Sequence, residues 1–218
     1  MLVKDRMTAN PVTITPETSL KDALALIRSQ PFRHLPVVDE DNRPVGIVTE
    51  KSLVYASPSP DLSLSVFEID YLLSRTMVSQ IMQQETVVVS PEVPIEEAAR
   101  IMVDHRIGCL PVVQDNRLVG IISDTDIFRV FVEGLGGGHP SLRVTVTIPE
   151  RVGSLAQLAN CIAQVGGNIH SLGTFWGEGP QDRILAFRVE GVDREELVAS
   201  LESNDIQIRH IWEPESSS

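Results

Sequence analysis

Cysteine is scarce in this 218-residue chain, and neither Cys109 nor Cys161 belongs to a disulfide or metal-binding spacing pattern. No apolar run reaches the roughly 18 residues of a membrane-spanning helix, and no secretory signal pattern is present. The five histidines also lack the clustering of a tetrahedral metal site. The sequence therefore predicts a cytoplasmic protein with reduced thiols, no metal and no membrane partner.

Positive charge is also in short supply. Eighteen lysines and arginines face 30 acidic residues, which gives a formal net charge of −12, and no basic cluster occurs. Because nucleic acids and anionic membranes bind clustered basic side chains, neither is expected as a partner. Catalytic signatures such as Gly-x-Ser-x-Gly, the P-loop and His-Glu-x-x-His are missing as well. We therefore expect no enzyme activity, no catalytic residues and no catalytic cofactor.

What the chain does contain is an internal repeat. The sequence Leu-Pro-Val-Val that begins at Leu35 returns at Leu110, and Val-Gly-Ile at Val45 returns at Val119. A duplication of this length indicates two equivalent supersecondary units. Such units usually face each other across a pseudo-two-fold axis, and the cleft between them is a natural ligand site.

Each repeat is predicted to run strand, helix, strand, turn, strand and helix. The opening strands are expected at Pro11–Thr15 and Thr86–Ser90, which are rich in β-branched residues. Leu-Pro-Val-Val is expected as a buried strand that the chain enters through the proline. Thr49 and Ser123 suit the N-cap of the final helix in each repeat.

Domain boundaries follow from breaker residues. Ser57–Asp61 separates the repeats, a helix is expected over Leu62–Ser74, and Gly134–Pro140 is the clearest linker. The predicted organisation is repeat 1 at 1–56, a linker with a helix at 57–75, repeat 2 at 76–133, a glycine-rich linker at 134–140, a third domain at 141–213 and a polar tail at 214–218.

The third domain is predicted to run β-α-β-β-α-β. Leu142–Ile148 alternates as a half-buried strand does, and Gly166-Gly167 ends the first helix by allowing positive φ. This order gives an antiparallel sheet with both helices on one face, the ferredoxin-like arrangement. The overall fold class is therefore α+β.

The strongest local signal for ligand binding is the segment Gly120–Asp126. Ser123 ends a strand and opens a helix whose amide groups favour an anion, so its hydroxyl suits a phosphate. The Asp126 carboxylate suits the paired hydroxyls of a ribose. The same spacing also makes a capping box, in which Asp126 reaches back to the Ser123 amide. In the first repeat Thr49 is kept but Ser52 replaces the aspartate, so any second site should be weaker.

Arg33 and His34 precede the first Leu-Pro-Val-Val, where the second repeat has Gly108 and Cys109. If the repeats face each other, the Arg33 guanidinium and His34 would reach a phosphate held at Ser123. The alternative is a solvated arginine and a half-buried histidine at a helix end.

Both repeats resemble CBS motifs, which pair into Bateman modules that commonly bind adenine nucleotides. Gly-h-h-(Ser/Thr)-x-x-Asp is that family's nucleotide signature, and its Ser/Thr meets phosphate while its Asp meets ribose. In that family the first strand of the motif lines the adenine pocket, and basic residues before Leu-Pro touch phosphate. The resemblance thus implies a nucleotide site of Ser123, Asp126, Arg33, His34, Thr86, Val87 and Val88, with Thr49 in a weaker second site.

The third domain resembles ACT domains, which often bind an amino acid where two of them pair. Such domains commonly carry Asp-x-Pro-Gly-h-Leu and Gly-x-Asn-Ile, and this chain has Glu150–Leu155 and Gly166–Ile169, with Val152 where proline is usual. The implied amino-acid contacts are Arg151, Gly153, Asn168 and Ile169. The alternative is that the glycines only form turns and the domain only dimerises.

Two CBS motifs followed by an ACT domain resemble the acetoin utilization AcuB family. The resemblance implies a non-enzymatic regulator whose repeats bind AMP, ADP, ATP or S-adenosylmethionine. The ACT domain would sense an amino acid or mediate homodimerisation, and the whole would control an unidentified partner enzyme. The alternative is a structural module that has no physiological ligand and docks on a metabolic enzyme.

Overall fold

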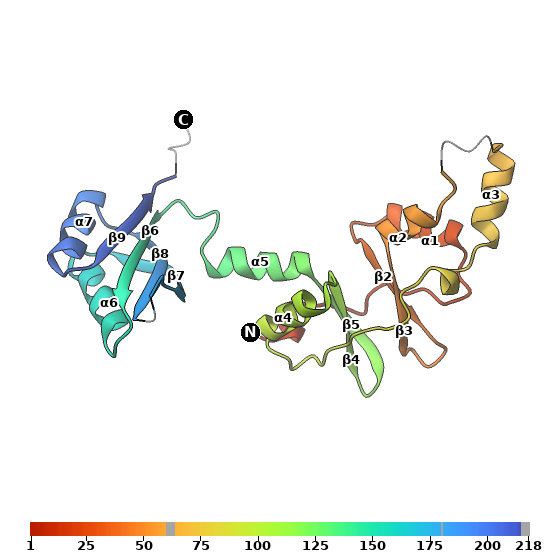
Figure 1. Ribbon diagram of the computed structural model, residues 1–218, viewed down its shortest axis with the longest axis horizontal. Helices are drawn as coiled ribbons and strands as arrows, with labels where there is room; N and C mark the ends of the chain where they lie inside the picture. Colours follow the sequence, from red (N-terminus) through yellow and green to blue (C-terminus); the bar gives the residue numbers. More distant parts are fainter. Residues whose placement is uncertain (60–63, 180, 215–218) are drawn as a thin grey trace. The chain divides into compact units, whose positions relative to one another are not determined.

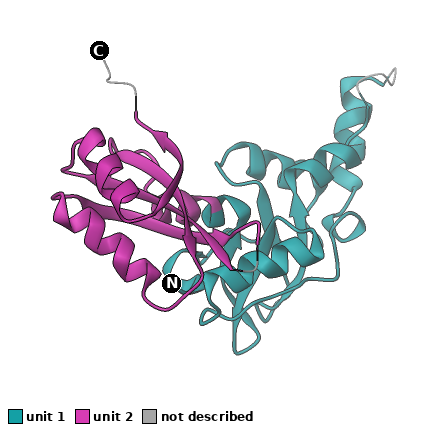
Figure 2. Cartoon of the chain, turned by 60° about the vertical axis from the view of Figure 1, so that its left-hand side comes forward, with its two compact units in different colours: residues 1–127 teal, residues 128–218 magenta. Residues whose placement is uncertain are grey.

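Two units make up the chain in the computed structural model: an N-terminal unit of residues 1–127 and a C-terminal unit of residues 128–218 (Figure 2). The structure describes residues 1–59, 64–179 and 181–214. Residues 60–63 of the predicted linker and residues 215–218 of the predicted tail lie outside the described residues. None of the helices in the described part of the chain combines the length and hydropathy of a transmembrane span.

The first repeat buries one face of its first long helix. Ser19 caps this helix by accepting a hydrogen bond from the N–H of Asp22, and every apolar residue at helical spacing from Leu20 to Ile27 lies in the core. A later helix begins after the cap residue Ser65, inside the range expected from the sequence. The elements are η1 (Val3–Asp5), β1 (Thr8–Ala9), α1 (Leu20–Arg28), β2 (His34–Val38), β3 (Pro44–Thr49), α2 (Glu50–Ala56) and α3 (Val66–Arg75) (Figure 1).

The second repeat follows the same plan. Its helix α4 buries Ile95, Ala98 and Met102, the positions that match the buried stripe of α1. Its hairpin places Cys109 opposite Ser123, as His34 lies opposite Thr49 in the first repeat. The elements are η2 (Val78–Gln80), α4 (Ile95–His105), β4 (Cys109–Gln114), β5 (Arg117–Ser123) and α5 (Asp124–Gly134).

The opening strands predicted for the two repeats are reduced to single bridges, Ile14 with Val37 and Val89 with Val112. The sequence also placed each proline at the start of its strand, whereas β2 and β4 begin two residues earlier. Pro36 is tolerated inside β2 because its carbonyl accepts from Ile14 on the side away from β3. The missing proline N–H would point to that same side, so the β2–β3 ladder does not need it.

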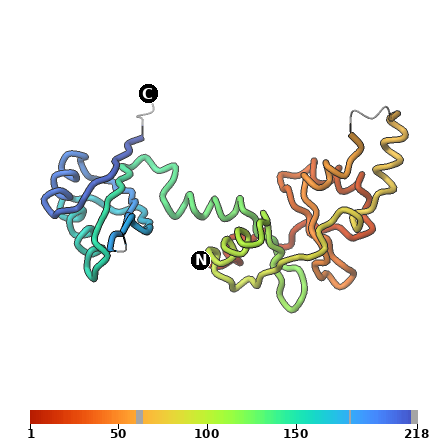
Figure 3. The backbone as a smooth tube through the Cα atoms, in the orientation of Figure 1, coloured from red at the N-terminus to blue at the C-terminus, as the bar shows by residue number. Residues whose placement is uncertain are grey.

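The two repeats exchange their first residues. Thr8 and Ala9 of β1 pair with β5 of the second repeat, while Gln83 of the second repeat pairs with Ile47 of β3. The main-chain N–H of Val3 donates to Val93, so the start of the chain runs beside the second repeat (Figure 3). Each hairpin is therefore completed by the other repeat, and the two repeats form one folded unit.

The C-terminal unit is a four-stranded antiparallel sheet in the order β7-β8-β6-β9 with two helices. This is the β-α-β-β-α-β order predicted for the ferredoxin-like arrangement. Its core joins the apolar face of the sheet to both helices, with Phe187, Leu158 and Leu201 fully buried. The elements are β6 (Leu142–Pro149), α6 (Ser154–Gln164), β7 (Asn168–Trp176), β8 (Asp182–Glu190), α7 (Arg194–Ser203) and β9 (Gln207–Trp212).

The glycine-rich segment before β6 is held against the C-terminal sheet. The guanidinium of Arg188, in β8, donates to the main-chain oxygens of Leu135, His139 and Ser141. Gly136 adopts positive φ and is buried, with no room for a side chain beside Ser171 and Arg188. The segment predicted as a linker at 134–140 is thus bonded to the C-terminal unit.

Candidate functional site

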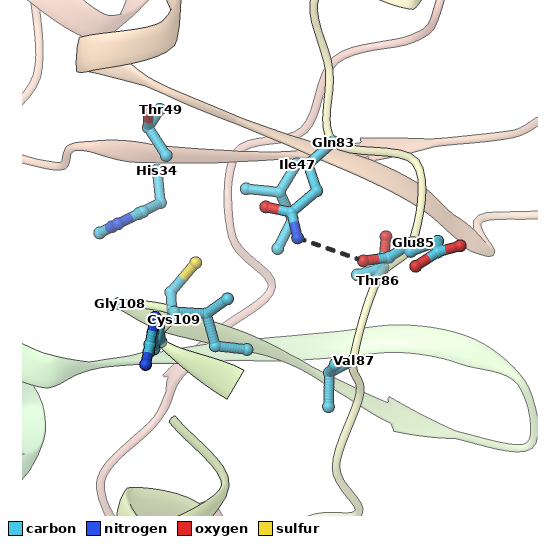
Figure 4. Close-up of a pocket in the computed structure, with 11 residues that line it drawn as sticks. His34, Ile47, Thr49, Gln83, Glu85, Thr86, Val87, Gly108 and Cys109 are labelled. Atoms are coloured by element: carbon cyan, nitrogen blue, oxygen red, sulfur yellow. Dashed lines mark hydrogen bonds between the residues drawn. The ribbon is translucent and has the colours of Figure 1, made fainter. Parts of the chain in front are cut away.

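A cavity of about 170 Å³ lies in the N-terminal unit where the two repeats meet (Figure 4). The first repeat contributes residues from β2 and β3. The second repeat contributes the extended segment before α4 and the turn that joins α4 to β4. The cavity is lined by His34, Ile47, Thr49, Gln83, Glu85, Thr86, Val87, Arg106, Ile107, Gly108 and Cys109.

His34 faces the second repeat at Gly108. A Cβ placed on Gly108 would lie 3.3 Å from the His34 Nε2 atom and 3.3 Å from an Asp124 carboxylate oxygen. The absence of a side chain at Gly108 therefore leaves room for the His34 ring. Burial is the main cause that lowers the pKa of His34 below its ordinary 6.5; Arg33 lowers it further, while Asp124 opposes the shift. A neutral imidazole offers one donor and one acceptor to a ligand.

Ser123 and Asp126 adopt the capping-box geometry. One carboxylate oxygen of Asp126 accepts from the Ser123 main-chain N–H at 2.9 Å and from the Ser123 hydroxyl at 2.7 Å. This is the capping alternative that the sequence left open. Neither residue lines the cavity, although Ser123 lies directly opposite the cavity residue Cys109 in the β4–β5 ladder.

In the first repeat, Thr49 and Ser52 form the equivalent capping box. Thr49 accepts from the N–H of Ser52 at 3.0 Å, and Ser52 accepts from the N–H of Thr49 at 2.9 Å. The Ser52 hydroxyl also donates to the Thr49 carbonyl. No carboxylate is available at Ser52, so this repeat lacks the group that the second repeat holds at Asp126.

The structure gathers only some of the predicted nucleotide residues around the cavity. His34, Thr86, Val87 and Thr49 line it. Val88 does not, and its side chain is 40% exposed because the next residue, Val89, turns into the core. Arg33 also lies outside the lining and is exposed, as the alternative reading of that residue expected.

Sequence reasoning missed the arginine that lines the cavity. Arg106 lines the cavity from the C-cap of α4, where it adopts a left-handed conformation with φ of 56°. Pro31 occupies the equivalent position in the first repeat, so comparing the two repeats gave no indication of a role for Arg106. Glu85 lines the same cavity, which therefore presents one cationic and one anionic side chain.

Thiol chemistry has little support at this cavity. Burial, with a smaller contribution from the Asp124 carboxylate, raises the pKa of Cys109 to about 12. The thiol is therefore protonated at neutral pH and acts as a small apolar wall. Among the described residues, no group of three or more His, Cys, Asp or Glu side chains is arranged to hold a metal ion.

The C-terminal unit has its own cavity, of about 270 Å³, at the N-terminal end of α6. It is lined by Ile148, Pro149, Glu150, Arg151, Ser154, Leu155, Thr174, Arg183 and Leu185. Of the predicted amino-acid contacts, Arg151 lines it and Gly153 caps α6 beside it. Asn168 and Ile169 begin β7 and pair with the last residues of β8, whereas the cavity takes the first residues of β8. One chain therefore does not bring the four predicted contacts together.

Comparison with known proteins identifies both repeats. Residues 3–59 and 78–133 match the CBS domain family, and together they make up more than half of the chain. A CBS domain-containing protein of Dictyostelium discoideum is 33% identical over 136 residues, which cover 62% of this chain and 94% of that protein. Inosine-5'-monophosphate dehydrogenase of Staphylococcus aureus is 34% identical over 145 residues, which cover 64% of this chain but only 27% of the enzyme.

Solved structures agree with this match. An acetoin utilization protein (AcuB) from Vibrio cholerae is 33% identical with a TM-score of 0.50, over 61% of this chain and 90% of its own. A CBS domain pair in complex with 5'-methylthioadenosine and S-adenosyl-L-methionine is 28% identical with a TM-score of 0.50, over 60% and 95%. CBSX2 in complex with AMP is 28% identical with a TM-score of 0.51, over 60% and 96%.

Proposed function

The chain belongs to the CBS-domain family, and we propose that its two repeats bind an adenine nucleotide or S-adenosylmethionine at the cavity between them. The observation that carries the proposal is the make-up of this cavity, which combines apolar walls with Arg106 and His34. Similar CBS pairs hold adenosyl ligands: AMP in one, and 5'-methylthioadenosine with S-adenosyl-L-methionine in another.

Different side chains of the cavity would bind the adenine ring and the anionic group of such a ligand. Thr86, Val87 and Ile107 would receive the adenine ring, because they form the least polar wall of the second repeat. Arg106 and His34 would bind the phosphate of a nucleotide, or the carboxylate in the methionine part of S-adenosylmethionine.

The ribose is assigned to Asp126, whose carboxylate is the only acidic group at the signature position of either repeat. The bonds to Ser123 occupy one oxygen of this carboxylate, and a ribose that binds this oxygen takes it from Ser123. A capping interaction contributes only about 1 kcal/mol, so two hydrogen bonds to a ribose offset its loss. The freed Ser123 hydroxyl and N–H then face the anionic group.

This exchange supports a regulatory role without catalysis. Asp126 lies in the first turn of α5, and the segment that follows α5 is bonded to the C-terminal sheet through Arg188. A ligand that changes the first turn of α5 therefore acts on the element that leads into the C-terminal unit. Such regulation needs different ligand affinities in the two arrangements of α5.

The C-terminal unit is assigned to sensing or assembly. Its strand order, with Gly153 and Gly166 in positive-φ turns beside α6, supports an ACT domain. We propose that it binds a small metabolite or joins two copies of the chain, and that the dimer controls a partner enzyme. The predicted contacts at Arg151 and Asn168 would meet only across two such domains, since one chain keeps them apart.

Isothermal titration with AMP, ATP and S-adenosylmethionine tests the nucleotide site. Asp126→Ala should weaken binding at least about tenfold, because it removes the ribose acceptor. Glu68→Ala is the matched control, since the Glu68 carboxylate closes the same kind of capping box on Ser65 at the start of α3 and lies outside the cavity lining. Equal effects of the two variants would show that Asp126 acts only through its helix cap.

A module without a ligand is the competing function. It is favoured by the exposed apolar side chains of Phe128, Phe131 and Val132 on α5, which suit docking on a protein. A thermal-shift panel separates the two, because a ligand at about a hundred times its dissociation constant stabilises by about 2.7 kcal/mol. No shift with any nucleotide or amino acid would favour the docking module.

A further inference from the structure

The sheet of the C-terminal unit packs both of its helices on one face. That face carries Val144, Val146 and Phe187, which share one core with the apolar residues of α6 and α7. Successive side chains of a strand point to opposite faces, so Arg143 of β6 and Arg188 of β8 point to the other face, called the outer face below. The ladder places these two arginines directly opposite each other.

A tryptophan on the edge strand β9 completes this row. Trp212 lies opposite Arg143 in the ladder, on the side away from Arg188. The centre of its ring is 5.2 Å from the guanidinium carbon of Arg188, and the residue is 44% exposed. The row therefore combines exposed aromatic area with guanidinium groups.

No acidic side chain neutralises the row. Within the described part of the chain, no carboxylate forms an ion pair with Arg143 or Arg188. Arg183 and Arg209 of the same sheet each pair with a glutamate. Like charges directly opposite each other in a sheet are destabilising. The pair of Arg143 and Arg188 thus lowers stability unless an anion from outside the unit meets it.

The two arginines differ in the donors that they leave open. Arg188 is 8% exposed, and its guanidinium donates to three main-chain oxygens of the glycine-rich segment and β6. Arg143 is only half-buried, and its Nη1 group donates to the Thr145 hydroxyl at 3.1 Å. The Nε and Nη2 groups of Arg143 have no acceptor among the described residues. Arg143 is therefore the residue that can bind an added acceptor.

Charge and shape together indicate what meets this row. Neither cavity described above is lined by Arg143, Arg188 or Trp212, so the row is an open surface that suits a polypeptide segment. The chain carries a net charge of −12, so an acidic segment is repelled elsewhere and attracted here. A second copy of the same face would set arginine against arginine, which disfavours self-pairing.

We infer that the outer face docks an acidic segment of a partner protein, with a carboxylate on Arg143 and apolar atoms on the Trp212 ring. An arginine binds a carboxylate through two parallel hydrogen bonds, which the open Nε and Nη2 groups supply. The inference rests on the proposed control of a partner enzyme and gives that partner a docking surface. The nucleotide cavity lies in the other unit and shares none of these residues.

A peptide of six glutamates tests this surface on the full chain at low ionic strength. Trp176→Phe leaves Trp212 as the only tryptophan, whose fluorescence reports binding. The glutamate peptide should change this fluorescence at submillimolar concentration, and high salt should abolish the change. No change would overturn the inference. A larger change with a peptide of six lysines or with single-stranded oligothymidylate, or an equal change with inorganic sulfate, would overturn it as well.

Two matched variants locate the bound peptide. Arg143→Thr should weaken the glutamate peptide at least about fivefold, because it removes the two donors. Arg194→Thr removes an exposed arginine from α7, which packs on the opposite face of the sheet, and should leave the affinity unchanged. Equal losses in the two variants would reduce the effect to overall charge and contradict a site at Arg143.

Arg143→Glu separates docking from a purely structural role. It sets opposite charges across β6 and β8, so the urea midpoint should rise while binding of the glutamate peptide is lost. A lower midpoint would show that Arg143 supports the fold instead. AMP should bind Arg143→Glu as it binds the unmodified chain, so failure of the docking surface is distinguishable from failure of the nucleotide site.

Discussion

Asp126 accepts hydrogen bonds from both the main-chain N–H and the hydroxyl of Ser123, at 2.9 and 2.7 Å. These are the two residues whose spacing matches the nucleotide signature of CBS motifs. The proposed ribose would bind this same carboxylate. A ligand that did so would act on the first turn of α5.

Gly108→Ala should weaken nucleotide binding several-fold. The new methyl group would lie 3.3 Å from both His34 Nε2 and Asp124, closer than most real contacts, so one of these side chains must move. Titration with AMP measures the loss. Gly134→Ala is the control, since a Cβ there meets nothing within 4 Å and an alanine in α5 should stabilise the helix by up to about 1 kcal/mol. Unchanged affinity in Gly108→Ala would show that the position of His34 does not affect ligand binding.

Arg188→Met should destabilise the C-terminal unit by about 2–3 kcal/mol, because the buried guanidinium satisfies three main-chain oxygens. Urea denaturation followed by tryptophan fluorescence suits this test, since Trp176 and Trp212 both lie in this unit. Arg194→Met, which removes an exposed arginine from α7, should change little. If both variants lose the same stability, the bonds to the glycine-rich segment contribute nothing.

Stability should fall as the pH drops below about 6.5, and His34 should account for part of the fall. Burial lowers the pKa of His34 in the folded chain, so the unfolded chain takes up a proton first. The stability from the neutral imidazole is complete above pH 6.5 and is lost as the pH falls toward the lower, folded-state pKa. Urea midpoints measured between pH 5 and 8 should show a smaller decrease in His34→Gln. His105→Gln, which replaces an exposed histidine of α4, should keep the decrease of the unmodified chain.

Cys109 should resist alkylation in the folded protein. A pKa of about 12 leaves roughly one thiol in ten thousand ionised at pH 8. Iodoacetamide labelling followed by mass spectrometry should therefore modify Cys109 only after denaturation. Rapid modification of the folded chain at pH 8 would show that the cavity opens to bulk water.

The repeat allowed much of the N-terminal unit to be predicted. Hairpins and helices are local structures, so apolar periodicity and cap residues such as Thr49 were enough to place them. The opening strands were wrong because the sequence shows β-branched residues but not the number of pairing partners. Ile14 and Val89 each find only a single bridge.

The candidate site was predicted only in part for a related reason. His34 was identified from its place in the repeat, and Thr86 and Val87 from the resemblance to CBS motifs. All three line the cavity. Arg106 carries no repeat signal, and only the left-handed turn after α4 brings it there. Whether Asp126 serves the helix or a ligand also depends on geometry that spacing alone does not contain.

The sequence by itself determined that two similar repeats exist and that only the second repeat carries an aspartate at the signature position. Both facts follow from residue order alone. The two repeats share their motifs, and Ser52 occupies in the first repeat the position that Asp126 occupies in the second. Only the tertiary structure decided that the two repeats exchange their first residues and that Gly108 leaves room for His34. It also decided that the Ser154 hydroxyl has no hydrogen-bond partner among the described residues. These relationships join residues far apart in the chain, or depend on which polar groups remain unpaired once the core has formed.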